Sequence, residues 1–186
     1  MSIESNNGLA FGLKPRKPET KEQRQAFENH PRRIQDRVHR PVADAIYRAT
    51  FGDVKIKRVD EMGADLAVGM ALDLLGVDFY VAFPNGTLLA GQEKYLSHSC
   101  AKYRTVTVSE HSWKHCAAQI YFCGYLTEGG ESFNPWVLLD WAMVMIATAH
   151  KTIQWGLRSS NSRYPSFWHT SFDGIPDDCL IASSRT

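Results

Sequence analysis

The sequence has few cysteines, and none of them form a closely spaced pair. Its four cysteines, Cys100, Cys116, Cys123 and Cys179, include no Cys-x-x-Cys motif. Such isolated thiols are typical of reduced, mostly buried cysteines in a cytoplasmic protein. We therefore expect neither a disulfide framework nor a metal site built on cysteine pairs.

The sequence also lacks a long uninterrupted hydrophobic run. Its longest apolar stretch, residues 136–149, is shorter than a bilayer span and contains Asp140. The opening residues, Met1 to Glu4, have no basic start followed by an apolar segment. These features predict a cytoplasmic protein that makes no membrane contact.

The net charge is small, at +1, so the chain does not resemble an acidic DNA mimic. The charge is unevenly distributed. Residues 1–40 hold nine Lys/Arg and five Asp/Glu, and the remainder holds twelve and fifteen. A basic leading arm beside a mildly acidic body suits local contact with nucleic acid. A solvated helix face and a polar tail explain the same asymmetry equally well.

A chain of 186 residues with 44% hydrophobic residues is long enough for one packed domain. Residues 1–20 are polar and contain Pro15 and Pro18, so we expect a disordered tail there. Residues 21–186 are expected to form a single α/β domain with a mixed central β-sheet flanked by helices.

Hydrophobic periodicity predicts the main elements of this domain. Residues 21–50 have a helical pattern that we expect Pro31 and Pro41 to interrupt. Residues 64–75 are ambiguous and include a short helix as one interpretation. Asn134-Pro135 begins either a helix, or a strand to Leu139 followed by a helix that Asp140 caps. Predicted strands cover residues 54–59, 103–109, 117–126 and, at a sheet edge, 167–172.

The segment 76–96 contains the most informative pattern in the chain. It reads as two strands joined by a tight turn at Pro84-Asn85-Gly86, because Asn-Gly supplies the positive φ angles of such turns. Asp78 opens the first strand. On the returning strand, Gln92 and Lys94 share one face and Glu93 points to the other. If the register brings Asp78 beside Gln92, one end of the hairpin carries the oxygen ligands and the ammonium group needed to hold a divalent metal and a phosphate.

This Asp…Gln-x-Lys hairpin resembles the active-site hairpin of the PD-(D/E)XK nuclease-like superfamily. The resemblance covers roughly residues 40–126 and implies a restriction-endonuclease-like αβββαβ core with N- and C-terminal extensions. It implies a nuclease that hydrolyses DNA with Mg²⁺ or Mn²⁺, with Asp78, Gln92, Glu93 and Lys94 as catalytic candidates. Small members of such families often belong to mobile elements or to defence and counter-defence systems.

Two departures from the family pattern weaken the catalytic expectation. The middle position is Gln92 rather than a carboxylate, unless Glu93 takes that role through a bulge. The acidic residue of the leading helix has three competing candidates, Glu61, Asp44 and Asp73. The alternative is therefore a catalytically inactive member of the fold that binds nucleic acid or a protein partner, as a monomer or a homodimer.

Basic residues provide the candidates for DNA contact. Arg33, Arg37 and Arg40 have helical spacing and line one face of the predicted helix. Lys102, Arg104 and Lys114 follow the hairpin and are suited to phosphate contacts. Each of these residues is equally well explained as a solubilising surface residue. Trp168 lies in a polar segment, where an aromatic ring can stack on a base.

A zinc-stabilised interaction module is a third alternative. His111 and His115 have the i, i+4 spacing of zinc ligands on a helix and precede Cys116. Only His98 and Cys100 are near enough in sequence to complete the site. Surface histidines on a helix between strands explain the same pattern.

Overall fold

The computed structural model describes residues 31–61, 71–72, 75–159 and 166–184, with backbone only at residues 31–35 and 111. The chain forms two compact units, residues 1–37 and residues 38–186. In the first unit, the described residues 31–37 form the start of helix α2 (Pro31–Phe51). The predicted polar tail at 1–20 lies outside the described residues.

Helix α2 begins at Pro31, where the missing N–H is not needed, and ends at Phe51. His39, Ala43 and Tyr47 recur at intervals of four residues and are buried, so they form the inward face of the helix. The predicted interruption at Pro41 is wrong. Pro41 lies inside the helix with its side chain exposed, and the packing of the inward face holds the helix together across it.

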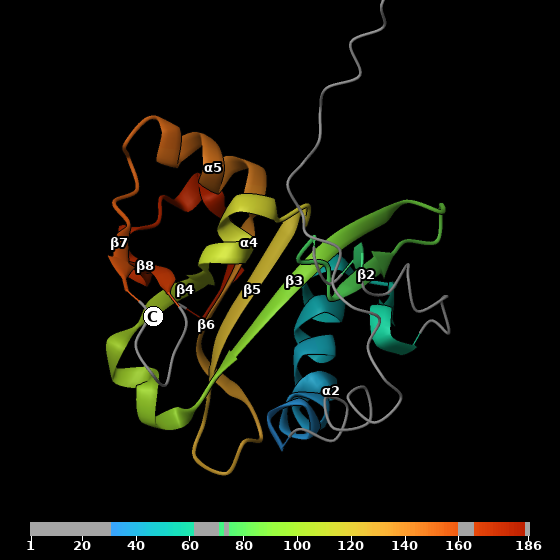
Figure 1. Ribbon diagram of the computed structural model, residues 1–186. Coiled ribbons are helices and arrows are strands. Elements are labelled where there is room, and N and C mark those ends of the chain that lie inside the picture. Colours follow the sequence, from blue (N-terminus) through green and yellow to red (C-terminus); the bar gives the residue numbers. More distant parts are fainter. Residues whose placement is uncertain (1–30, 62–70, 73–74, 160–165, 185–186) are drawn as a thin grey trace, which may run out of the picture. The chain divides into compact units, whose positions relative to one another are not determined.

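The main sheet is mixed and has six strands in the order β1-β2-β3-β5-β6-β9 (Figure 1). All neighbouring strands are antiparallel except β3 and β5, which are parallel. This establishes a mixed α/β architecture with a mixed central sheet. The strand bounds are β1 Lys55–Arg58, β2 Phe79–Ala82, β3 Leu88–Leu96, β5 Ile120–Leu126, β6 Phe133–Asp140 and β9 Leu180–Ser183.

The predicted hairpin is confirmed as β2 and β3. The turn closes through the Phe83 amide, which donates to the Thr87 carbonyl at 2.9 Å, and Gly86 adopts a φ of 87°. A residue other than glycine is strained at that angle. The turn therefore sets a register in which Phe79 pairs with Gly91, and the next residues beyond this pair are Asp78 and Gln92.

A second, three-stranded sheet has the order β4-β8-β7. The strands predicted at 103–109 and 167–172 therefore form this sheet rather than the main one. The edge position predicted for the later segment is wrong, because β8 pairs with both β4 and β7. The strands are β4 Thr105–Ser109, β7 Gly156–Arg158 and β8 Phe167–Ser171.

Asp140 marks the change from strand β6 to helix α5 (Trp141–Ala149). Its carboxylate accepts a hydrogen bond from the Met143 amide at 3.1 Å, which caps the helix. The structure thus confirms the interpretation of this segment as a strand followed by a helix that Asp140 caps. The short helix α4 covers Glu110–His115, and 3₁₀ segments lie at Val59–Glu61 (η1), His98–Tyr103 (η2), Phe172–Gly174 (η3) and Asp177–Cys179 (η4).

Two hydrophobic cores lie on opposite faces of the main sheet. Strand β5 is buried along its whole length, and its alternating residues enter both cores: Phe122 lies in one and Tyr121 in the other. Ala43 and Tyr47 of α2 pack against the first core, and β4 and α5 pack against the second. Figure 1 shows α2 on one face of the sheet, with α4, α5 and the small sheet on the other. Within the described part of the chain, no helix combines the length and apolar character needed to cross a membrane.

Candidate active site at the Asp78 hairpin

Asp78 is held in place through its backbone and its side chain. Its amide donates to the Gly91 carbonyl at 2.9 Å, and its own carbonyl accepts from the Val59 amide at 3.1 Å. Its Oδ2 accepts a hydrogen bond from the Glu93 amide at 2.8 Å. Asp78 thus extends the ladder beyond β2, and its carboxylate lies against β3.

Gln92 and Lys94 lie on the face of β3 that is turned toward α4. The Gln92 Nε2 donates to the Ser112 Oγ at 2.9 Å, and the Gln92 Oε1 accepts from the Cys116 thiol at 3.3 Å. The positive charge of Lys94 acts on buried Cys123 of the same core. Strand alternation thus gives Gln92 and Lys94 the shared face that the sequence predicts.

Asp78 belongs to this face as well. Its negative charge acts on Cys116 and Tyr121, and it raises the pKa of both groups in addition to the larger effect of their burial. The structure therefore brings Asp78, Gln92 and Lys94 to one side of the hairpin.

Glu93 points to the opposite face, toward α2. Its Oε1 accepts a hydrogen bond from the Tyr47 hydroxyl at 2.9 Å and forms an ion pair with Arg58. Gln92 and Glu93 pair with successive residues of β5, Tyr121 and Phe122, without a register shift. The alternative in which Glu93 replaces Gln92 through a bulge is therefore wrong, because a regular strand alternates its side chains.

Arg58 is a residue that sequence reasoning missed. Its guanidinium is nearly buried, with 3% of the side chain exposed, and it forms ion pairs with Glu93 and with Asp44 of α2. Burial alone lowers the pKa of Arg58, but the carboxylates, Glu93 above all, raise it above its ordinary value. The alternation of Lys55 to Arg58 along β1 is the sequence signal that places Arg58 inside.

Tyr95 extends the same buried network. Burial, followed by the charge of Glu93, raises the pKa of the Tyr95 phenol, so this group stays neutral. Its hydroxyl is buried and lies beside the Glu93 carboxylate. The α2 side of the hairpin thus carries a largely buried cluster that includes Arg58, Glu93 and Tyr47.

Two of the three candidates for an additional acidic ligand, Asp44 and Glu61, are paired with arginine side chains. The Asp44 carboxylate is bound to Arg58, and the Glu61 carboxylate lies 3.0 Å from Nη1 of Arg40. Asp73 lies outside the described residues. No described acidic residue beside Asp78 therefore takes the place of the acid that the family pattern expects on the leading helix.

Asp78 and Gln92 fit a loosely held hard cation. No three His, Cys, Asp or Glu side chains in the described residues are grouped closely enough to hold a metal. Asp78 supplies one carboxylate, and the Gln92 carbonyl oxygen accepts from the Cys116 thiol, which is a weak donor. Mg²⁺ is commonly held by one or two carboxylates together with substrate phosphates and water, which matches this sparse donor set.

Ser112 and Cys116 also line this face; Ser112 was not considered from the sequence, and Cys116 was considered only as part of the zinc alternative. Ser112 is buried, and its hydroxyl accepts hydrogen bonds from Gln92 and from Ser109, the N-cap of α4. Helix α4 is thereby fixed over the hairpin. Only the tertiary contact between α4 and β3 reveals these residues.

The zinc alternative involves His111, whose side chain lies outside the description, so it stays a prediction. His115 is exposed at the end of α4. The thiol of Cys116 is directed to the carbonyl of Gln92 and to that of Gly76. The structure thus gives Cys116 a place beside the hairpin.

Most of the predicted DNA-contacting residues have partners within the protein. Arg40 pairs with Asp60 and Glu61, Lys114 pairs with Glu110 at 2.8 Å, and Arg104 lies 3.9 Å from Asp173. Lys102 lies over the ring of Tyr103 at 5.2 Å. Arg37 is exposed, and the side chain of Arg33 is not described.

Trp168 is part of an aromatic cluster rather than an isolated surface ring. It stacks on Trp113 with the ring centroids 5.3 Å apart, and its indole nitrogen is buried. Trp113 also contacts Trp141 and Trp155. These contacts occupy at least one face of the Trp168 ring.

Comparison with known proteins found no matching family model, no matching curated protein and no matching solved structure.

Proposed function

We propose that this protein is a metal-dependent phosphodiesterase that cleaves DNA and has a core of the PD-(D/E)XK nuclease-like type. The order of elements supports the proposal. Helix α2 is followed by the antiparallel strands β1, β2 and β3, then by helix α4 and by β5, which is parallel to β3. Among the described elements, this order is compatible with an αβββαβ core in which β4 is inserted before α4.

One observation carries the proposal: the Asp78 carboxylate accepts a hydrogen bond from the Glu93 amide, and Gln92 and Lys94 flank Glu93 on strand β3. Asp78 and Gln92 would hold Mg²⁺ or Mn²⁺, which when bound supplies Lewis-acid activation of the phosphate and of water. The ammonium of Lys94 stabilises negative charge that develops on the phosphate and orients the attacking water. Glu93 is excluded from this chemistry because its carboxylate is enclosed by Arg58 and Tyr47.

The test is cleavage of supercoiled plasmid, linear DNA and branched DNA in the presence of Mg²⁺ or Mn²⁺. Wild type, Lys94→Ala and Lys151→Ala are compared, because Lys151 is an exposed lysine on the turn after α5. We expect metal-dependent nicking that is lost in Lys94→Ala and retained in Lys151→Ala. Activity that survives in a folded Lys94→Ala would place the chemistry elsewhere, and no cleavage of any substrate would refute the proposal.

A second candidate function is DNA binding without catalysis. It is favoured because few oxygen ligands for a metal are found at the site, and because the Gln92 side-chain amide already forms hydrogen bonds with Ser112 and Cys116. The two functions differ in their response to metal. An enzyme should gain thermal stability from Mg²⁺ or Mn²⁺ in the presence of DNA, and Asp78→Ala should abolish that gain. A pure binding protein should show no metal-dependent shift in either form.

A further inference from the structure

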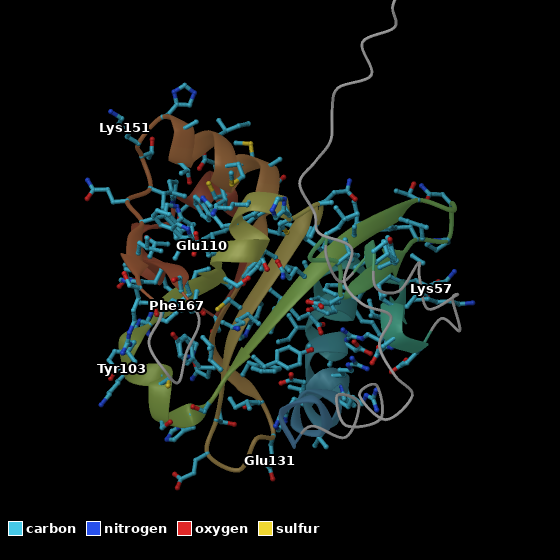
Figure 2. All side chains as sticks on the ribbon, in the orientation of Figure 1. Lys57, Tyr103, Glu110, Glu131, Lys151 and Phe167 are labelled. Carbon is cyan, nitrogen blue, oxygen red and sulfur yellow. The ribbon has the colours of Figure 1, made fainter. Side chains whose placement is uncertain are left out.

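The two lysines of edge strand β1 lie on the same side of the sheet as Asp78. Along β1, Lys55 and Lys57 are exposed, whereas Arg58 is buried. Arg58 is directed to Asp44 of α2 and to Glu93. Because neighbouring side chains on a strand alternate, Lys55 and Lys57 point away from α2. Figure 2 shows Lys57 projecting from this edge into solvent.

The register brings these lysines close to the candidate active site. Lys57 pairs with Tyr80 and Lys55 pairs with Ala82. Asp78 lies two residues before Tyr80, and the hydrogen bond from the Val59 amide to its carbonyl continues the ladder to that point. Asp78 is therefore the diagonal neighbour of Lys57, at a typical separation of about 7–8 Å.

The two ammonium groups are available to an external anion. No ion pair joins Lys55 or Lys57 to another residue in the described part of the chain. In contrast, the cations predicted from the sequence as DNA contacts are largely neutralised, as in Arg40 with Asp60 and Glu61. Residues i and i+2 of a strand are about 6.6–6.8 Å apart, and flexible lysine stems can adapt that spacing to phosphates along a nucleic acid strand.

We infer that Lys55 and Lys57 bind the DNA backbone beside the scissile phosphate, so that the strand runs across the exposed face of β1 and β2 to Asp78. The inference rests on the proposed function, and it names the substrate contact of that site. The charge of the lysines complements the phosphates. These contacts position the substrate without reading its sequence. Tyr80, half-buried between Lys57 and the hairpin, lies on the same path.

The test measures binding of a fluorescein-labelled DNA duplex by anisotropy, without divalent metal, over a range of salt concentrations. The variants are Lys55→Ala, Lys57→Ala, their double variant and the control Lys151→Ala. Each phosphate contact contributes a slope of about 0.9 in the logarithm of affinity against that of salt. We therefore expect each β1 variant to weaken binding about 8-fold at about 0.1 M salt and to reduce the slope by about one.

The control and the charge-conserving variants make the result specific. Lys151→Ala should bind as wild type does, and Lys55→Arg and Lys57→Arg should keep the salt slope. Unchanged binding in the double variant, an equal loss in Lys151→Ala, or no binding by wild type would overturn the inference. The lysines would then serve only to protect an edge strand from pairing with another sheet.

Cleavage assays on the same proteins separate this inference from the proposed function. Nicking by wild type together with unaltered binding in the double variant would refute the lysine contact alone. DNA binding that depends on the two lysines, without any nicking, would refute the proposed nuclease activity and support the inferred contact of the lysines with DNA.

Discussion

The backbone amide of Glu93 donates a 2.8 Å hydrogen bond to the carboxylate of Asp78. The side chain of Glu93 is anchored on the other face of β3 by Arg58 and Tyr47. One residue thus links the candidate metal ligand to a buried ion-pair cluster. The position of Asp78 therefore depends on packing against α2, whose residues Ala43 and Tyr47 lie in the core on the other side of the sheet.

Removal of Arg58 should destabilise the protein strongly. Arg58→Ala leaves the carboxylates of Glu93 and Asp44 without their common partner, and breaking a buried pair costs about 3–5 kcal/mol. Arg48→Ala is the matched control, because Arg48 is exposed and lies 4.0 Å from Asp44. Its cost should be below about 1 kcal/mol. Urea unfolding measures both values, and equal costs would contradict the assigned cluster.

Gly91 should not tolerate a side chain. A Cβ at this position would lie 2.2 Å from the ring of Phe79, which is also stacked on Tyr47 at 4.7 Å. Overpacking of this kind costs about 1–3 kcal/mol or more. Gly91→Ala should lower the free energy of unfolding accordingly, as measured by urea unfolding. An increase or no change would show that the Phe79 ring moves aside freely.

Substitution of Asp78 should change the reactivity of Cys116. Burial raises the pKa of the Cys116 thiol, and the negative charge of Asp78 raises it further. Asp78→Asn removes that charge, so the pKa falls and more thiolate is present at a given pH. A charge several Å away in a water-like medium contributes about 0.7 kcal/mol, or roughly a threefold faster alkylation.

The measurement is the rate of iodoacetamide modification at Cys116, followed by peptide mass spectrometry. Cys100 in the same samples serves as the internal control and should react at the same rate in both proteins. A slower reaction of Cys116 in Asp78→Asn would mean that the two side chains do not interact as described.

Stability should decrease at alkaline pH. Burial raises the pKa of Cys123 to about 12, compared with 9.0 for an ordinary thiol. The folded state therefore favours the protonated thiol. The protonated Cys123 thiol therefore makes its full contribution to stability below about pH 9, and this contribution is lost as pH rises toward 12. The free energy of unfolding falls by at most about 1.4 kcal/mol per pH unit in this range.

Cys123→Ala removes this contribution and retains the buried tyrosines, whose pKa values are raised mainly by their own burial. Urea unfolding of both proteins at neutral pH and at about pH 10.5 should show a loss that is up to about 2 kcal/mol larger in wild type. Identical losses in the two proteins would show that Cys123 does not govern the alkaline transition.

Local chemistry made the hairpin predictable from the sequence. The Asn85-Gly86 turn restricts the strands to one register, and period-two alternation then separates Gln92 and Lys94 from Glu93. The preference of aspartate for the N-cap position likewise predicted a helix that begins after Asp140, which was one of the two interpretations left open for residues 134–149. These predictions depend on neighbours within a few residues, where backbone geometry dominates.

Other features depend on contacts between distant segments. The pattern of residues 105–109 predicts a strand but does not say which sheet it joins, and Pro41 lies within α2 because the inward face of the helix is buried. The partners of Glu93 come from α2 and β1, so no local spacing reveals that its carboxylate is enclosed.

The sequence by itself determined which side chains share a face of the Asp78 hairpin, because alternation and turn geometry act locally. Only the tertiary structure decided what each face meets. One side is closed by Arg58 and Tyr47, and the other is bounded by α4 and continues to the exposed lysines of β1. The physical reason is that the desolvation and pairing of charges depend on segments far apart in the chain, and these are brought together only when the sheet and its helices pack.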